Sequence, residues 1–230
     1  MLNKQLKKIR GFVSFHYIVA VMPGGARKMA LIDLAAKDPA SFASYSIEQI
    51  VAICGDGKLL DNSECSKQLR EFLKLQDVKS LARYALYCLE SKYERSGFVL
   101  QDVVNEIGRR LGYEVTNGRY SGVQKEIGFD GLWAHGPYKL VVEVKTTDAY
   151  RINLDTVCGY SDKLLATTGA HAEAMNTLIV VGRQDTGDLE AQVRGSRHAW
   201  TVRLISVDAL IKLMFVNDEL GSGPIKFLAV

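Results

Sequence analysis

Three ionisable residues, Asp130, Glu143 and Lys145, lie inside segments that otherwise read as apolar β-strands. Charged groups are expensive to bury unless they are paired or bind an ion. Two carboxylates supply the hard oxygen ligands that Mg²⁺ prefers. A neighbouring lysine could orient or deprotonate a water, or stabilise charge that develops on a phosphate oxygen. Together the three side chains would be equipped for metal-dependent hydrolysis of a phosphodiester.

Two strands must position these side chains, and the sequence pattern predicts them at residues 126–134 and 138–147. A turn centred between Gly136 and Pro137 would place Asp130 directly opposite Glu143. Two carboxylates in that position repel each other unless a cation offsets their charge. Glu143 and Lys145 are two residues apart, so we expect their side chains on the same face of one strand.

Asp130, followed thirteen residues later by Glu143-Val144-Lys145 on a hairpin between two helices, resembles the active site of the PD-(D/E)xK nuclease superfamily. The resemblance covers residues 96–183. It implies an α/β, restriction-endonuclease-like fold with a mixed central sheet flanked by helices, and Mg²⁺-dependent cleavage of DNA. It further implies that Asp130, Glu143 and the Val144 carbonyl bind the metal, and that Lys145 acts in the chemical step.

The chain departs from the family pattern in the first core helix, where many members carry a glutamate and this sequence has Gln101. A glutamine can still hold a metal-bound water, so Gln101 is included among the candidate catalytic residues. The number of metal ions is left open. Glu106 lies further along the same helix, at a phase expected to be nearer its polar side.

The acid-x-lysine tripeptide alone is weak support, because it recurs at Asp56/Lys58, Asp77/Lys79 and Glu90/Lys92 in helical or turn contexts. Only Glu143 follows an apolar strand and has a partner acid across a hairpin. The alternative interpretation of the three residues is a surface ion cluster on an edge hairpin.

Basic residues in predicted loops and at helix ends are candidate contacts to DNA phosphates: Arg119, Lys125, Arg151, Arg194 and Arg197. For Arg151 alone a solvent-exposed loop is the favoured interpretation, and the others are equally compatible with a solvated loop. The first 28 residues hold six Lys or Arg and no acid, so attraction to a polyanion is expected to be strongest near the N-terminus.

The periodicity changes along the chain and predicts a helical N-terminal domain at 1–95, for recognition or assembly, and a nuclease domain at 96–230. Residues 65–91 can be drawn as a helix-turn-helix. The second of those helices is rich in core-type residues (Leu81, Tyr84, Ala85, Leu86, Leu89), which favours packing or dimerisation over reading of bases.

The composition, 47% hydrophobic and 24% charged over 230 residues with a net charge of +3, is that of a folded globular protein. Four cysteines without C-x-x-C spacing argue against a disulfide scaffold and a structural zinc site, and favour a cytoplasmic setting. No run reaches the 18 apolar residues of a membrane-spanning helix.

The sequence therefore predicts a Mg²⁺-dependent endonuclease that acts on double-stranded DNA, of restriction or defence type, working as a homodimer away from membranes. A structure-specific or repair nuclease of the same fold is one alternative. A DNA-binding or regulatory module that kept the fold without cleaving is another.

Overall fold

This computed structural model describes residues 31–91, 93–121, 128–146, 151–168, 174–182 and 185–221. Its centre is a five-stranded sheet in the order β1-β2-β3-β4-β5. The strands are β1 (Glu114–Asn117), β2 (Gly131–His135), β3 (Tyr138–Lys145), β4 (Met175–Val181) and β5 (Val202–Ser206). The first three strands pair antiparallel and the last three parallel. The predicted α/β fold with a mixed sheet flanked by helices is confirmed, and it is consistent with a restriction-endonuclease-like arrangement.

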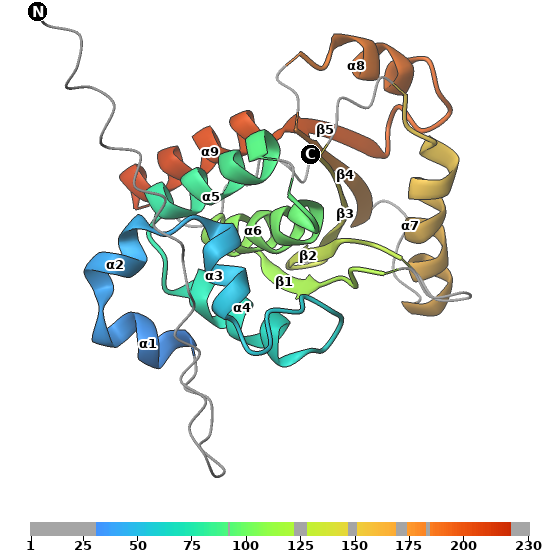
Figure 1. Cartoon of the computed structure of the whole chain (residues 1–230). Coiled ribbons are helices and arrows are strands. Elements are labelled where there is room, and N and C mark those ends of the chain that lie inside the picture. Colours follow the sequence, from blue (N-terminus) through green and yellow to red (C-terminus); the bar gives the residue numbers. More distant parts are fainter. Residues whose placement is uncertain are drawn as a thin grey trace, which may run out of the picture.

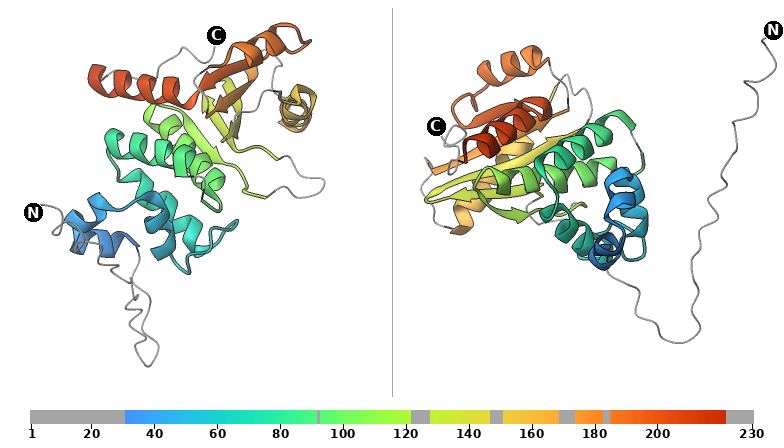
Figure 2. Two further views of the ribbon diagram at one scale, coloured as in Figure 1. Left: turned by 45° about the horizontal axis from the view of Figure 1, so that its top comes forward. Right: turned by 90° about the vertical axis from the view of Figure 1, so that its left-hand side faces the viewer.

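Helices cover both faces of this sheet (Figures 1 and 2). The alternation of side chains along β4 shows which helices lie on which face. Leu178 and Val180 join the main hydrophobic cluster, with α5 (Val78–Ser91), α6 (Ser96–Arg110) and α9 (Val207–Leu220). Ile179 and Val181 join a second cluster, with α7 (Leu154–Thr168) and α8 (Gly187–Arg194).

The N-terminal helices form a layer of their own beside α5 and α6 (Figure 1). They are α1 (Leu31–Lys37), α2 (Pro39–Ser44), α3 (Ile47–Ile53) and α4 (Glu64–Lys74). Ser63 caps α4 by accepting the Ser66 N–H. Residues of this layer and of the sheet share one hydrophobic cluster. The predicted boundary between domains at residue 95 stays a prediction.

Helix α5 buries one face, as its apolar content indicated, with Leu81, Tyr84 and Ala85 at 1% exposure or less. Leu86, another of the core-type residues of this helix, is 41% exposed and lies outside the core.

Helix α6 is buried almost all round, from Val99 to Gly108 without interruption. Its predicted apolar face is confirmed, and the helix is followed by Gly112 in the left-handed region at φ 87°. Glu106 was expected nearer the polar side, but it is only 3% exposed. It is buried because Arg109 and Arg110 of the same helix pair with its carboxylate at 3.2 and 3.1 Å.

The β2–β3 hairpin has the predicted register, with Gly131 opposite Val142 and His135 opposite Tyr138 around a turn at Gly136. The first strand was predicted from residue 126, but β2 begins only at Gly131. Asp130 therefore lies just before the paired segment.

All four cysteines are buried thiols that form no disulfide. In the part of the chain that the structure describes, no helix is both long enough and apolar enough to cross a membrane.

Candidate active site

Asp130 is attached to β3 at two points. Its N–H donates to the Val142 carbonyl at 3.0 Å, and its Oδ2 accepts the Val144 N–H at 2.7 Å. The carboxylate therefore lies beside β3 at the level of Val144, between the two charged residues of that strand.

Glu143 and Lys145 share a face of β3, as predicted from their spacing, because Lys145 Nζ lies 2.5 Å from Glu143 Oε1. The adjacent valines, Val142 and Val144, pack toward the main hydrophobic cluster and α6. Alternation then directs Glu143 and Lys145 toward the face that α7 and α8 cover. Glu143 is 9% exposed, so its carboxylate lies largely inside the protein.

The two carboxylates interact electrostatically. Burial raises the pKa of Asp130, and the nearby charge of Glu143 raises it further, to about 7. The Val144 N–H and Lys145 oppose this rise in the pKa. An acid that keeps its proton near neutral pH lacks enough positive charge around it.

The pKa of Lys145 is shifted by the same kinds of effect, acting in the opposite directions. Burial would lower its pKa, but the hydrogen bond to Glu143 and the charges of Glu143, Asp130 and Tyr160 raise the pKa above its ordinary value. Lys145 is therefore an ammonium group at neutral pH.

The chemistry of the donor set fits a Mg²⁺ ion. In an extended strand the N–H and C=O of one residue point to the same side, and the Val144 N–H points toward Asp130. The Val144 carbonyl therefore points toward the same flank as the Asp130 carboxylate. Two carboxylates and this carbonyl are hard oxygen ligands. Across the described ranges, no three His, Cys, Asp or Glu side chains are grouped as a ready-made metal site.

Gln101 contacts the site at the main-chain carbonyl of Asp130 and not at its carboxylate. Its Nε2 donates to the carbonyl of Asp130 at 3.0 Å and more weakly to the carbonyl of Arg119 at 3.4 Å. Asn105, one turn further along α6, donates to the same Asp130 carbonyl at 2.9 Å. Sequence reasoning missed Asn105. The signal that could have found it is two amide residues spaced i, i+4, and therefore on one face of the predicted helix.

Tyr160 of α7 was also missed. It acts on Lys145 electrostatically, and its ring lies against Gly128, where an added Cβ would be 3.6 Å from the Tyr160 hydroxyl oxygen. Tyr160 therefore lies near the site from the opposite layer, a position that no local sequence pattern predicts.

The residues predicted to contact DNA lie on separate elements of the structure. Arg119 follows β1, and its guanidinium lies 3.8 Å from Asp61. Arg151 is exposed just before α7, and Arg194 pairs with Glu190 on α8 at 3.0 Å. Lys125 lies outside the described residues.

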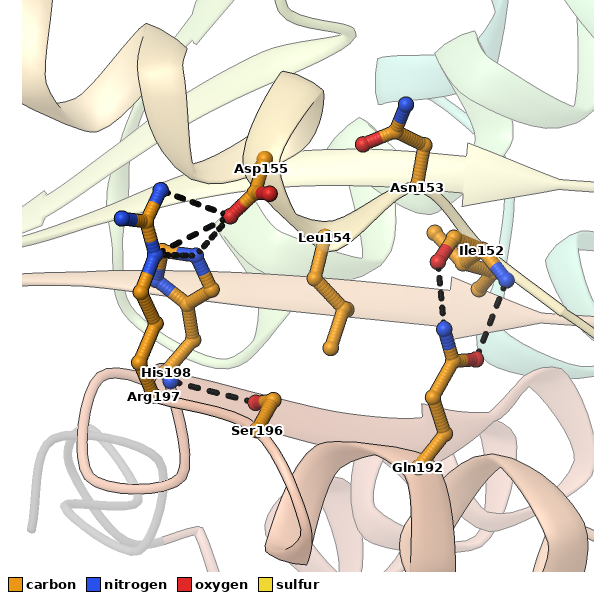
Figure 3. A pocket seen from close by; sticks show the side chains of 8 residues that line it. All are labelled: Ile152, Asn153, Leu154, Asp155, Gln192, Ser196, Arg197 and His198. Atoms are coloured by element: carbon orange, nitrogen blue, oxygen red, sulfur yellow. Dashed lines mark hydrogen bonds and ion pairs between the residues drawn. The ribbon is translucent and has the colours of Figure 1, made fainter.

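Arg197 borders a pocket of about 520 Å³ between the start of α7 and the end of α8 (Figure 3). Asp155 Oδ1 accepts from Arg197 Nη2 at 2.8 Å and lies 2.7 Å from His198 Nε2. Gln192 closes the other end with two hydrogen bonds to the main chain of Ile152. A phosphate group would have to compete with Asp155 for Arg197.

No family model and no curated protein matches this chain. Among solved structures, a complex of the restriction endonuclease PspGI with substrate DNA is similar to it. The two chains are 11% identical over 85% of this chain and 81% of that one, with a TM-score of 0.36. Because the likeness is low on both measures, we draw the function from the site itself.

Proposed function

We propose that this protein is a Mg²⁺-dependent endonuclease that hydrolyses phosphodiester bonds of double-stranded DNA, of restriction or defence type. The observation that carries the proposal is the interaction between the Asp130 and Glu143 carboxylates, with the Lys145 ammonium bonded to Glu143. A buried pair of acids is unfavourable unless a cation joins it. A purely structural ion cluster would need only one acid for the one lysine.

Asp130, Glu143 and the Val144 carbonyl would hold the metal. When bound there, Mg²⁺ supplies a Lewis acid that polarises the phosphate and favours ionisation of a water. The proposed place of binding follows from the electrostatic interaction of the two carboxylates and from the position of the Asp130 carboxylate at the Val144 N–H, at the open end of the hairpin.

Lys145 would stabilise negative charge on the phosphate under attack. The hydrogen bond to Glu143 and the charges of the two acids raise its pKa, so the ammonium group would supply positive charge beside the phosphate. Its bond to Glu143 holds the ammonium beside the acid pair.

Phosphates on either side of the cleaved bond would be held by the basic residues predicted from the sequence, namely Arg119, Lys125, Arg151, Arg194 and Arg197. Cutting both strands requires two such sites, so we further propose that the protein works as a homodimer.

One observation favours a non-cleaving DNA-binding module as the second candidate. The amide of Gln101 stands in the place of the family glutamate and is directed at a main-chain carbonyl. A site with one acid fewer binds metal less strongly.

Incubation of supercoiled plasmid with the protein, in Mg²⁺ or Mn²⁺ and in EDTA, tests the proposal. We expect cleavage only with a divalent cation, and its loss in Lys145→Ala. Lys139→Ala is the matched control, because Lys139 lies on the same strand and face, six residues from Lys145.

If the wild type leaves the plasmid as intact as Lys145→Ala in both metals, the nuclease proposal is wrong. If the plasmid is cut, sequencing the ends of the products gives the recognition site and the stagger.

A further inference from the structure

We propose that Gln101 and Asn105 are positioning residues, whose side-chain amides hold the main chain of Asp130 so that its carboxylate stays beside Glu143. The inference rests on the proposed function, because it assigns these amides a part in that reaction.

The carbonyl oxygen of Asp130 accepts three N–H donors. They are Nε2 of Gln101 at 3.0 Å, Nδ2 of Asn105 at 2.9 Å and the Gly118 N–H at 2.9 Å. A carbonyl oxygen has two lone pairs, so this acceptor is saturated. The peptide group that follows Asp130 is therefore fixed from the helix side and from β1.

Buried partners orient Asn105. Its Oδ1 accepts from Nε1 of Trp133 at 2.9 Å, and Trp133 is 0% exposed. Since one end of the amide is bound to the indole, the other end must face the Asp130 carbonyl. Gln101 lies on the same side of α6, four residues earlier, and is 3% exposed.

Two glycines allow this close approach. A Cβ at Gly131 would lie 2.1 Å from Asn105 Oδ1, and one at Gly118 would lie 1.9 Å from the Phe129 carbonyl oxygen. Neither distance is possible for real atoms. Only glycine at these two positions lets the helix amides and β1 reach the peptide of Asp130.

The fixed peptide determines where the acid points. Asp130 precedes the first paired residue of β2, and on its main chain the N–H donates to the Val142 carbonyl of β3 at 3.0 Å. The amides hold the Asp130 carbonyl from the helix side, and the Val144 N–H holds the carboxylate at 2.7 Å. Without the amides, that carbonyl would lose two of its three donors, and the carboxylate could move away from Glu143.

This role differs from that of a residue that holds a metal-bound water, and one substitution separates the two. Gln101→Glu restores the family's acid but removes the N–H donor to Asp130. We expect Gln101→Glu, Gln101→Ala and Asn105→Ala each to lower kcat by about 10- to 100-fold, with little change in KM for DNA. If Gln101→Glu cleaves as well as the wild type, the positioning role of Gln101 is wrong.

Asn217→Ala is the matched control. Asn217 also donates a side-chain amide to a main-chain carbonyl of α6, that of Arg110 at 2.8 Å, at the end of the helix furthest from Gln101. Should Asn105→Ala lower kcat no more than Asn217→Ala does, the inference is overturned.

Amide hydrogen exchange at Val144 tests the inference without catalysis. Its N–H is bonded to the Asp130 carboxylate, so exchange should become at least about tenfold faster in Asn105→Ala, as in Asp130→Ala, and stay unchanged in Asn217→Ala. An unchanged rate in Asn105→Ala would overturn the inference. A wild type that cuts no DNA would instead overturn the proposed function, and the exchange rates would still decide whether the amides position Asp130.

Discussion

The Asp130 carboxylate accepts the main-chain N–H of Val144 at 2.7 Å, which places an acid from one strand between two charged residues of the next. This single hydrogen bond brings together Asp130, Glu143 and Lys145, although the first of them lies outside the paired part of the hairpin. The charge balance of this group determines how the protein should respond to pH and to metal ions.

Replacing Asp130 by asparagine should change how stability depends on pH. The folded protein raises the pKa of Asp130 from 3.8 to about 7, through burial first and then through Glu143. The stability that this group contributes is therefore complete below pH 4 and is lost as the pH rises through 7. Without divalent cations, Asp130→Asn should gain in melting temperature relative to the wild type between pH 4 and pH 8. A constant difference across that range would contradict the raised pKa.

Magnesium should stabilise the wild type against heat. A ligand that binds only the folded state at about 100 times its Kd contributes about 2.7 kcal/mol, which is a rise of about 5 to 11 °C for a chain of this size. Glu143→Gln should lose most of this shift, because it removes one of the two carboxylates. Lys139→Ala should keep it. If Glu143→Gln shifts as far as the wild type, the metal binds elsewhere.

Arg70→Ala should destabilise the fold more at high pH than at low pH. Asp102 is fully buried and bonded to Arg70 at 2.9 Å, and burial raises its pKa to about 6 despite that partner. Without Arg70 the buried carboxylate loses its bonded cation and keeps the hydrogen bond from the Tyr120 hydroxyl, at a cost of about 3 to 5 kcal/mol at pH 8. At pH 5 the acid takes a proton, so the cost falls.

Urea unfolding at the two pH values measures this difference for Arg70→Ala. Lys74→Ala is the control, because Lys74 and Glu71 form an exposed pair at 2.6 Å, and such pairs contribute about 1 kcal/mol or less. An equal loss at both pH values would show that Asp102 keeps its charge in the folded variant.

Asp61→Ala should reduce cleavage although Asp61 lies far from the acids in sequence. Its carboxylate accepts the N–H groups of Tyr120 and Ser121 at 2.7 and 3.3 Å, next to the loop whose Gly118 N–H holds Asp130. We expect kcat to fall by about tenfold. Asp56→Ala is the control and should cleave like the wild type. Asp56 is an acid of the same N-terminal layer, and its carboxylate accepts the N–H of Lys58 within its own turn. If the two variants cleave at equal rates, the contact that Asp61 of the N-terminal layer makes with this loop has no effect on cleavage.

The parts of the site that the sequence predicts are local. The turn at Gly136 sets the register, and the two-residue spacing of Glu143 and Lys145 sets their common face. These features depend on a hairpin of short span, so strand periodicity is enough to find them.

The polar side of α6 could not be predicted in the same way. Helical periodicity assigns Asp102, Asn105 and Glu106 to an exposed face, but all three are at most 3% exposed. The partners of Asp102 and Asn105 include Arg70 and the Asp130 carbonyl, 32 and 25 residues away along the chain, whereas Glu106 pairs with Arg109 and Arg110 of its own helix. The long-range pairs leave no periodic signal, and the pairing of all three groups makes their burial tolerable.

The continuous burial of α6 from Val99 to Gly108 also determines how the protein unfolds. One side of this helix completes the interior of the N-terminal layer and the other completes that of the sheet. Neither the N-terminal layer nor the sheet can unfold while the other stays folded, because each would lose its contacts with α6. Calorimetry should accordingly record a single cooperative endotherm, with α6 amides the last to become accessible to solvent.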